Sequence, residues 1–485
     1  MGIVIKQSIT NTITTYLGFG IGAINTLFLY TRFLSDEYYG LVAFILSAAN
    51  VMMPLLACGV HNSLVKFYSK YKGTNSLNSF LTLMLFLPML IIIPLTGVGV
   101  LANDCIGELI SKENPIVKDY VWHIFIVSIA FAYFEVFYAW AKVHMKTVFG
   151  NFMKEVFHRI AVSFLLIILH YNWISADEFI LYLIGVYVVR MIIMKLYAYS
   201  LRFPKISFDK IEDLNSILKY SFLIIIAGSI ATVILDIDKV MLNQYVQIEE
   251  VAYYSVAVFI ATVIAVPQRA MHQIMSPLTA QFLSSKKKAD LKDLYTRSSI
   301  NLFVVSGLIF LLILLNVSQL YLLIAPEYSS AIWVVFLISL AKLYDNLLGN
   351  NNAILFNSDY YRVVLYFGVL LTVFTVVLNA ILIPKYGLNG SALATFLAIA
   401  IYNTIKLLFV HKKFKMQPFT GNTLKVALLI VFLFGCFYFW DFSFGPIINI
   451  VLKSALVSAV YVILVVKFNL SDDINSIVNK YLGKL

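Results

Sequence analysis

The stretch SFLIIIAGSIATVILDIDKVML, residues 221–242, is long and apolar enough to cross a membrane, yet its second half carries Asp236, Asp238 and Lys239. Residues 252–277 form a second apolar arm that carries Arg269. A charge at the centre of a membrane helix costs about 2.5–3.5 kcal/mol, so such groups face a protein interior or a water-filled path rather than lipid. The stretch therefore predicts a polar cavity inside a bundle of membrane helices.

The composition excludes an ordinary soluble protein. Of the 485 residues, 61% are apolar and 13% are charged, and the mean hydropathy is +0.87. Soluble domains are about half apolar and about a quarter charged. The loops between the apolar stretches are too short for a separate enzyme domain. We predict an all-α, polytopic membrane protein that is not an enzyme and needs no cofactor.

A spanning helix needs about 20 apolar residues, and we expect about fourteen of them. Their predicted ranges are 9–34, 38–60, 79–101, 120–142, 160–176, 179–201, 221–245, 252–277, 302–324, 331–357, 363–384, 388–410, 426–440 and 446–468. An even number of crossings places both ends of the chain on the same side of the membrane.

The basic residues decide which side that is. Most of them fall in the loops on the side of the N-terminus, for example Lys70, Lys154, Arg159, Lys210, Lys287 and Lys413. The opposite loops offer little beyond Lys112, Lys118 and Lys385. Because loops rich in lysine and arginine stay in the cytoplasm, we expect both termini to be cytoplasmic. The net charge of +11 thus reflects topology and contact with membrane lipids, not binding of nucleic acid.

The chain also repeats itself. An offset of about 212 residues lays Glu37 and Gly40 over Glu249 and Ala252, with a short outer loop and a basic inner loop in each copy. Each copy holds an even number of crossings, so the copies are parallel and related by a pseudo-twofold axis along the membrane normal. We expect two six-helix lobes, residues 1–210 and 211–420, followed by two extra helices and a cytoplasmic tail in residues 421–485.

Four motifs carry a resemblance to a known family. They are FLYTRFLSDEYYGLVAF from Phe28, LDIDKVMLNQYV from Leu235, APEYSSA from Ala325 and LNAILIPKYGLNGSALAT from Leu378. In this order they resemble the bacterial oligosaccharide flippases, the polysaccharide-transporter branch of the multidrug/oligosaccharidyl-lipid/polysaccharide exporter superfamily. Locally, Pro384 and Gly387 in the last motif predict a tight outer turn between two helices.

The resemblance implies a function. It implies export of a polyprenyl-diphosphate-linked oligosaccharide from the inner to the outer leaflet of the bacterial cytoplasmic (inner) membrane by alternating access. The product would serve lipopolysaccharide, O-antigen or another surface polysaccharide, and other polysaccharide-assembly membrane proteins are potential partners. Whether a proton or a sodium ion is coupled to transport stays open.

Several intramembrane charges are candidates for a site. Arg269 suits a diphosphate because arginine offers a forked cationic donor, although it could instead reach toward cytoplasmic headgroups. Asp236 and Lys239 are three residues apart and are expected to pair with each other. Asp238 resembles an acidic position of the family and is a candidate for gating or ion coupling, with a structural bond between lobes as the alternative.

Residues 342–352 form a polar stripe on a predicted span. Lys342 is a second, weaker candidate after Arg269 for binding the diphosphate. Lys342 and Asp345 are also close enough on the helix to neutralise each other, and Asp345 is a candidate for ion coupling. Asn346 and Asn352, with other amides beside them, favour a hydrated surface that contacts sugar over a purely helix-packing one.

The first lobe offers further candidates. Glu135 and Arg190 fall at about the same depth in two spans, so we expect a buried ion pair with a role in gating. Asn25 and Asn50 are candidate sugar contacts, and Arg32 is expected to guard the outer mouth.

Two other function classes remain as alternatives. A drug or small-cation exporter of the same superfamily would favour acidic residues in the cavity of the first lobe. A polysaccharide polymerase or ligase would need an extended outer loop, and the longest one here is residues 102–119. No phosphate-binding glycine loop, zinc motif or nucleophile elbow is present in the sequence.

Overall fold

The computed structural model describes residues 2–482, and no strand is present in that range. The chain is an all-α membrane protein, as predicted. It divides into two compact units, Met1–Ser255 and Val256–Leu485, which we call unit 1 and unit 2. The lobe boundary expected at residue 211 rests on the internal repeat and stays a prediction.

Unit 1 contains helices whose order and bounds are as follows. They are α1 Gly2–Ile24, α2 Tyr30–Phe33, α3 Asp36–Leu56, α4 Val60–Tyr71, α5 Leu77–Phe86, α6 Met89–Leu101, α7 Asn103–Ile110, α8 Val121–Val143, α9 Val148–Phe152, α10 His158–His170, α11 Ala176–Leu201, α12 Leu214–Leu242 and the first half of α13 Ile248–Thr262. Two π-helical turns interrupt them, Asn25–Leu29 before α2 and Met153–Phe157 before α10.

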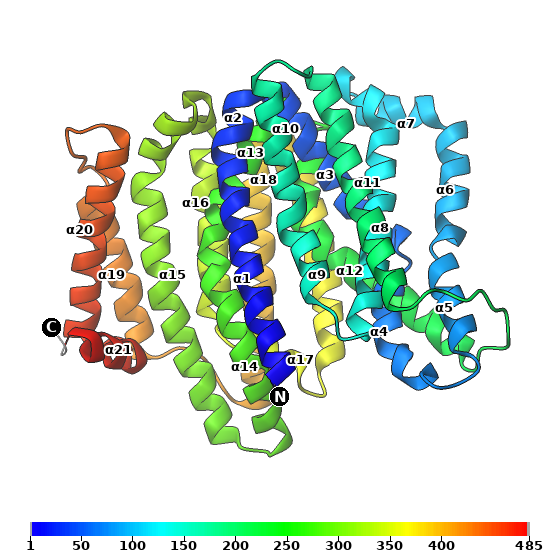
Figure 1. Ribbon diagram of the computed structural model, residues 1–485. Helices are drawn as coiled ribbons and strands as arrows, with labels where there is room; N and C mark the ends of the chain where they lie inside the picture. The colour runs from blue at the N-terminus through cyan, green and yellow to red at the C-terminus, as the bar shows by residue number, and fades with distance from the viewer. Residues whose placement is uncertain (1, 483–485) are drawn as a thin grey trace. The chain divides into compact units, whose positions relative to one another are not determined.

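Helix α8 lies at the centre of unit 1. It packs side by side with α3 and α11 (Figure 1). Most of its residues are apolar and buried, Phe134 and Trp140 almost completely, and Glu135 is the one charged residue in its middle. A helix whose surface is largely apolar and buried belongs in the interior of a bundle. The first turn of α3 is capped by Ser35, whose hydroxyl accepts from the backbone N–H of Tyr38, which fixes where this helix begins.

Gly40 allows α3 to touch the start of α13. A Cβ atom built on Gly40 would lie 1.8 Å from the carbonyl oxygen of Ile248. Neither backbone can give way without moving a whole helix. The absence of a side chain at this position therefore sets the distance between the two segments, which explains the glycine in the DEYYG motif.

We expect Gly40→Val to destabilise the protein strongly, and more than Gly97→Val in α6 does. Overpacking typically costs about 1–3 kcal/mol, and here the clash is with backbone. The thermal melting temperature of the purified variant should fall and its yield in membranes should drop. Gly97→Val in α6 is the matched control, because a Cβ there meets nothing within 4 Å. Equal melting temperatures for both variants would refute this reading of Gly40.

Unit 2 contains the second half of α13 and the remaining helices. They are α14 Val266–Ser284, α15 Lys288–Ile324, α16 Ile332–Leu347, α17 Asn351–Phe356, α18 Tyr361–Phe414, α19 Gly421–Phe437, α20 Pro446–Lys467 and α21 Asp472–Leu482. Helices α15 and α20 lie side by side (Figure 1). The long α18 reverses at Gly387, whose φ of 54° and ψ of −130° are not helical. This confirms the turn predicted from Pro384 and Gly387.

Ten helices in the described part of the chain are long and apolar enough to cross a membrane. The segment Arg362–Phe414 contains the reversal at Gly387 and so covers two of the predicted spans. Leu214–Ile226 and Gly421–Phe437 are shorter apolar helices. These findings are consistent with fourteen crossings, although the number itself stays a prediction.

Candidate functional site

Unit 1 encloses a polar cavity of about 480 Å³. We call it the charged cavity. It is lined by Leu46, Asn50, Met53, Phe131, Phe134, Glu135, Lys154, Glu155, His158, Arg159, Tyr187, Arg190 and Asp236. Three residues predicted as site residues from separate parts of the sequence, Asn50, Glu135 and Arg190, thus share one cavity.

Five segments supply the polar groups of the charged cavity. Asn50 comes from α3 and Glu135 from α8, while Arg190 comes from α11. Asp236 comes from α12. The fifth segment is the π-helical turn Met153–Phe157 with the start of α10, which supplies Lys154, Glu155, His158 and Arg159. A π-helical turn inserts an extra residue into the helical ladder and is frequent at functional sites.

Each carboxylate that lines the cavity has a basic partner. Lys154 donates to Glu135 at 2.5 Å. Asp236 is 2.8 Å from Lys239, as predicted, and both also bind the hydroxyl of Ser47. These pairs leave the carboxylates of the cavity neutralised.

The third pair joins neighbouring turns of one helical segment. Arg159 is 3.3 Å from the carboxylate of Glu155 and also donates to its carbonyl oxygen at 2.8 Å. Burial of charge in a bundle core is costly unless each group is paired and hydrogen-bonded, so this arrangement is what a stable charged cavity requires.

Arg190 is the exception. Only 7% of this residue is exposed, and no ion pair involves it in the described part of the chain. Its guanidinium carbon instead lies 4.3 Å from the ring centre of Phe134, 5.0 Å from Tyr187 and 5.3 Å from Phe131. Its Nε has no hydrogen-bond partner there. The cavity therefore holds one buried cation whose direct contacts are aromatic faces, while the carboxylates of Glu135 and Glu155 act on it from beyond ion-pair distance.

The predicted ion pair between Glu135 and Arg190 is wrong. Glu135 instead binds Lys154 of the π-helical turn Met153–Phe157, and both residues line the charged cavity. Depth along two helices was predicted from the sequence, but the direction in which each side chain points was not.

Two glycines of α1 seat Arg159. A Cβ atom on Gly18 would lie 2.4 Å from the carbonyl oxygen of Glu155, and one on Gly22 would lie 3.1 Å from Nε of Arg159. Small residues four apart let two helices approach closely. The cation of Arg159 is thus held against the backbone of α1.

Asn25 ties the same pair of helices together. Its Nδ2 donates to the carbonyl oxygen of Arg159 at 2.8 Å, and its Oδ1 accepts from the hydroxyl of Ser163 at 2.6 Å. With 3% exposure, the amide is committed to this contact and is not open to a sugar in this conformation.

Two further candidates in unit 1 lie outside the charged cavity. Arg32 is exposed at the end of α2, with its guanidinium carbon 5.9 Å from the ring centre of Phe28. Asp238 is buried and accepts a hydrogen bond from the hydroxyl of Tyr254 at 2.6 Å. Their proposed roles at the outer mouth and in gating stay predictions.

In unit 2, the polar stripe is mostly buried rather than hydrated. Asn346, Asn350 and Asn351 are at most 2% exposed, and their Nδ2 atoms donate to Ile264, Thr279 and Tyr295 respectively. The expectation of a hydrated amide surface is therefore wrong for these three residues, because neighbouring helices occupy their donors. Lys342, by contrast, is partly exposed on α16.

Asp345 and Asn352 meet a residue that we did not single out from the sequence, Lys406 of α18. Its Nζ lies 2.8 Å from Oδ1 of Asn352 and 3.9 Å from Oδ1 of Asp345. Gln268 of α14 donates to the other oxygen of Asp345 at 3.1 Å. Next to it, Arg269 is exposed.

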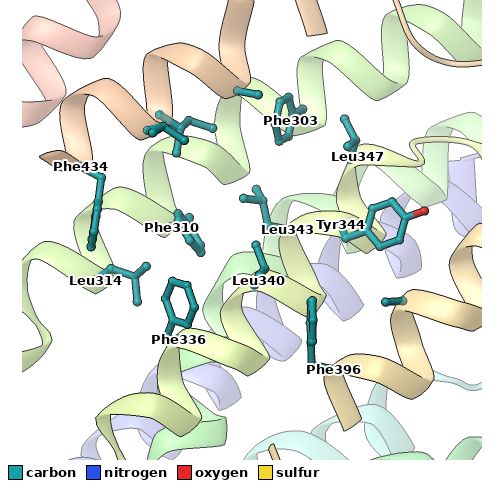
Figure 2. A pocket seen from close by; sticks show the side chains of 14 residues that line it. Phe303, Phe310, Leu314, Phe336, Leu340, Leu343, Tyr344, Leu347, Phe396 and Phe434 are labelled. Carbon is teal, nitrogen blue, oxygen red and sulfur yellow. The ribbon is translucent and has the colours of Figure 1, made fainter. Parts of the chain in front are cut away.

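Unit 2 also holds an apolar cavity of about 630 Å³. Helices α15, α16, α18 and α19 supply its walls, and Figure 2 shows the rings of Phe310, Phe336, Phe396 and Phe434 around it. The hydroxyl of Tyr344 is the single polar side-chain group among the lining residues. Such a cavity accepts a hydrocarbon chain and offers nothing to a sugar or a phosphate.

Four functional candidates were missed or misplaced by sequence reasoning. Lys154 and Arg159 were assigned to a basic cytoplasmic loop, and His158 and Lys406 were given no role. The available signal was the spacing of Glu155 and Arg159, four residues apart directly before an apolar run, which marks a paired charge on a helix rather than a loop.

Comparisons with known proteins agree with this architecture. A family model described as polysaccharide biosynthesis protein matches residues 4–267. The solved structure "Lipid II flippase MurJ, inward closed conformation" has a TM-score of 0.73 at 16% identity, covering 98% of this chain and 99% of that chain. An inward-facing multidrug resistance MATE family transporter of the MOP superfamily has a TM-score of 0.60 at 13% identity, covering 83% of this chain and 94% of that chain. A search of curated sequences gave no match.

Proposed function

The chain belongs to the polysaccharide biosynthesis protein family, and from this premise we propose that it is a flippase for a lipid-linked oligosaccharide. The substrate would be a polyprenyl-diphosphate-linked oligosaccharide that passes from the inner to the outer leaflet of the bacterial cytoplasmic membrane by alternating access. The product would enter the synthesis of a surface polysaccharide. A fold shared with a lipid flippase supports a lipid substrate.

The observation that carries the proposal is the unpaired Arg190 in the charged cavity. A buried cation without a direct ion pair attracts an anion, and a diphosphate is the anion of this substrate class. Its guanidinium offers forked donors that match phosphate oxygens, and Nε is without a partner in the described part of the chain. Aromatic faces stabilise the cation by only about 0.5–2 kcal/mol, so exchange of ring contact for phosphate contact is favourable.

Lys154 and Arg159 extend this site. Each is bound to a carboxylate of the same cavity, Glu135 and Glu155 respectively. A diphosphate that enters can accept hydrogen bonds from these cations while the carboxylates keep them charged and oriented. The cavity thus tolerates both the loaded and the empty state, which a carrier that works in cycles requires.

The lipid part of the substrate has a different requirement. Its hydrocarbon chain already lies in the apolar interior of the bilayer, so a protein site for it gains no hydrophobic transfer energy and must be apolar to avoid a desolvation cost. The apolar cavity of unit 2 fits such a chain, since aliphatic and aromatic side chains line it almost throughout. Each unit therefore offers a site suited to one part of an amphipathic substrate.

Export of this substrate does not demand strict ion coupling. A cytoplasm-negative potential assists outward movement of negative charge by about 2.3 kcal/mol per charge per 100 mV. Coupling to a proton or a sodium ion would add to this driving force without being required by it.

A drug or small-cation exporter is the second candidate, because Glu135, Glu155 and Asp236 line the charged cavity. All three carboxylates are neutralised by basic residues, which disfavours capture of a cationic drug. Reconstitution into liposomes separates the candidates. We expect transfer of a fluorescent polyprenyl-diphosphate sugar between leaflets, and efflux of a cationic dye without that transfer would favour the second candidate. Lengthening of the glycan would indicate a polymerase.

The proposed direction of transport depends on topology, which can be tested with single cysteines. In a chain whose three native cysteines are replaced by serine, a cysteine at Lys112 should react with an impermeant thiol reagent in intact cells, whereas one at Lys287 should not. Labelling is measured by a gel shift, with lysed cells as the control for access. The reverse pattern would place the termini outside the cytoplasm.

A further inference from the structure

Lys406 is a buried cation in a site built from oxygen ligands. The residue is 1% exposed, so its ammonium is out of contact with solvent. Oδ1 of Asn352 lies 2.8 Å from Nζ, Oδ1 of Asp345 lies 3.9 Å away, and the ring centre of Tyr402 lies 4.1 Å away. A carboxylate, an amide carbonyl and an aromatic face can bind a free cation as well as the ammonium of a lysine side chain.

The oxygen ligands are held in place independently of Lys406. Gln268 donates to Oδ2 of Asp345 at 3.1 Å, which orients Oδ1 of the same carboxylate toward Lys406. Asn352 sits in α17, just beyond the break in the helix at Gly349, where φ is +54°. Broken membrane helices present polar groups to ions in other secondary transporters. The ligands come from α16 and α17, whereas the cation comes from α18.

The side chain of Asp345 is 28% exposed while that of Lys406 is 1% exposed. The carboxylate therefore faces an open region, and the ammonium fills the buried end of the site. If the ammonium were absent, Asp345 would lose its cation on α18 and Asn352 would lose its donor, and small ions could reach these oxygens from the exposed side of Asp345.

We propose that these groups form a monovalent-cation site in unit 2 and that Lys406 is its permanently attached occupant, so that the unchanged chain binds no sodium ion at this site. The site binds a cation of the alkali class once the lysine is removed. This inference concerns the ion and not the substrate, so it does not rest on the proposed flippase function.

The experiment is a thermal melt of the purified full chain, monitored by intrinsic tryptophan fluorescence, in sodium chloride and in choline chloride at equal ionic strength. The melting temperature of the unchanged chain should be the same in both salts. Lys406→Met should melt lower than the unchanged chain in choline chloride and should regain several degrees in sodium chloride, because an ion that binds the folded state alone stabilises it. Adding Asp345→Asn to Lys406→Met should abolish the response to sodium.

Lys453 provides a matched control. It is also buried, at 2% exposure, and its Nζ lies 3.0 Å from Asp441. The side chain of Asp441 is 49% exposed, so water solvates it when the lysine is removed. Lys453→Met should therefore melt lower without any response to sodium.

Three results would overturn the proposal. They are equal melting of Lys406→Met in both salts, failure of this variant to fold in either salt, and a sodium response of the same size in the unchanged chain or in Lys453→Met. Because the readout is stability, loss of the proposed flippase activity would not affect the outcome.

Discussion

Arg190→Met should reduce export of the lipid-linked oligosaccharide by about 10- to 100-fold, because one hydrogen bond to a charged group contributes about 1.5–3 kcal/mol. The methionine fills the space among Phe131, Phe134 and Tyr187 without adding a donor. Arg190→Lys should recover part of the activity, since it restores the charge but not the forked geometry. The measurement is the rate of transfer of a labelled polyprenyl-diphosphate sugar between the leaflets of proteoliposomes.

Arg202→Met is the matched control for this experiment. Arg202 follows the end of α11, the helix that carries Arg190, and donates to the side chain of Asn78 at 3.1 Å, away from the charged cavity. The Arg202→Met variant should export the substrate at the rate of the unchanged chain. A well-folded Arg190→Met that exports normally would remove Arg190 from the substrate site and leave it a role in packing only.

The fold could be predicted from local features of the sequence. The hydropathy of the chain predicted a membrane protein, and Pro384 with Gly387 predicted the reversal in α18. Both features depend on residues that are close together in the sequence. The pairing of Asp236 with Lys239 was predictable for the same reason, since three residues along a helix place two side chains on one face.

The contacts between helices could not be predicted in this way. Glu135 and Arg190 match in depth, yet Glu135 binds Lys154. Asp345 pairs with Lys406, which lies 61 positions later in the chain and on another helix. The sequence predicts how deep in the membrane a side chain lies along its helix. The direction in which that side chain points around the helix axis depends on helix packing, which a single sequence does not specify.

The cations of the charged cavity were missed for a related reason. A rule that counts lysine and arginine near the ends of spans places Lys154 and Arg159 in a cytoplasmic loop. In the structure, a π-helical turn carries Lys154 and leads directly into α10, and glycines of α1 make room for Arg159. Neither the extra residue in the turn nor the approach of α1 leaves a trace in hydropathy.

Arg269→Ala should also abolish or greatly slow export, while the amount of protein in the membrane stays normal. Arg269 lies in the first turn of α14, after the 3-10 turn Val263–Ala265 and beside Pro267. The neighbouring Gln268 binds Asp345 of α16, which holds this end of the helix in place. The guanidinium is exposed and takes part in no ion pair in the described part of the chain, so it is available to an anion. The leaflet-transfer assay measures the effect.

The alternative for Arg269 is contact with lipid headgroups, and the variants distinguish the two. A diphosphate needs the forked donor, so Arg269→Lys should recover export only in part, whereas a headgroup contact would be satisfied by lysine in full. Lys288→Ala, at the exposed start of α15, is a control for the loss of one positive charge in unit 2 and should export normally. Full activity of a folded Arg269→Ala variant would assign Arg269 to the headgroups and leave the charged cavity of unit 1 as the site of the diphosphate.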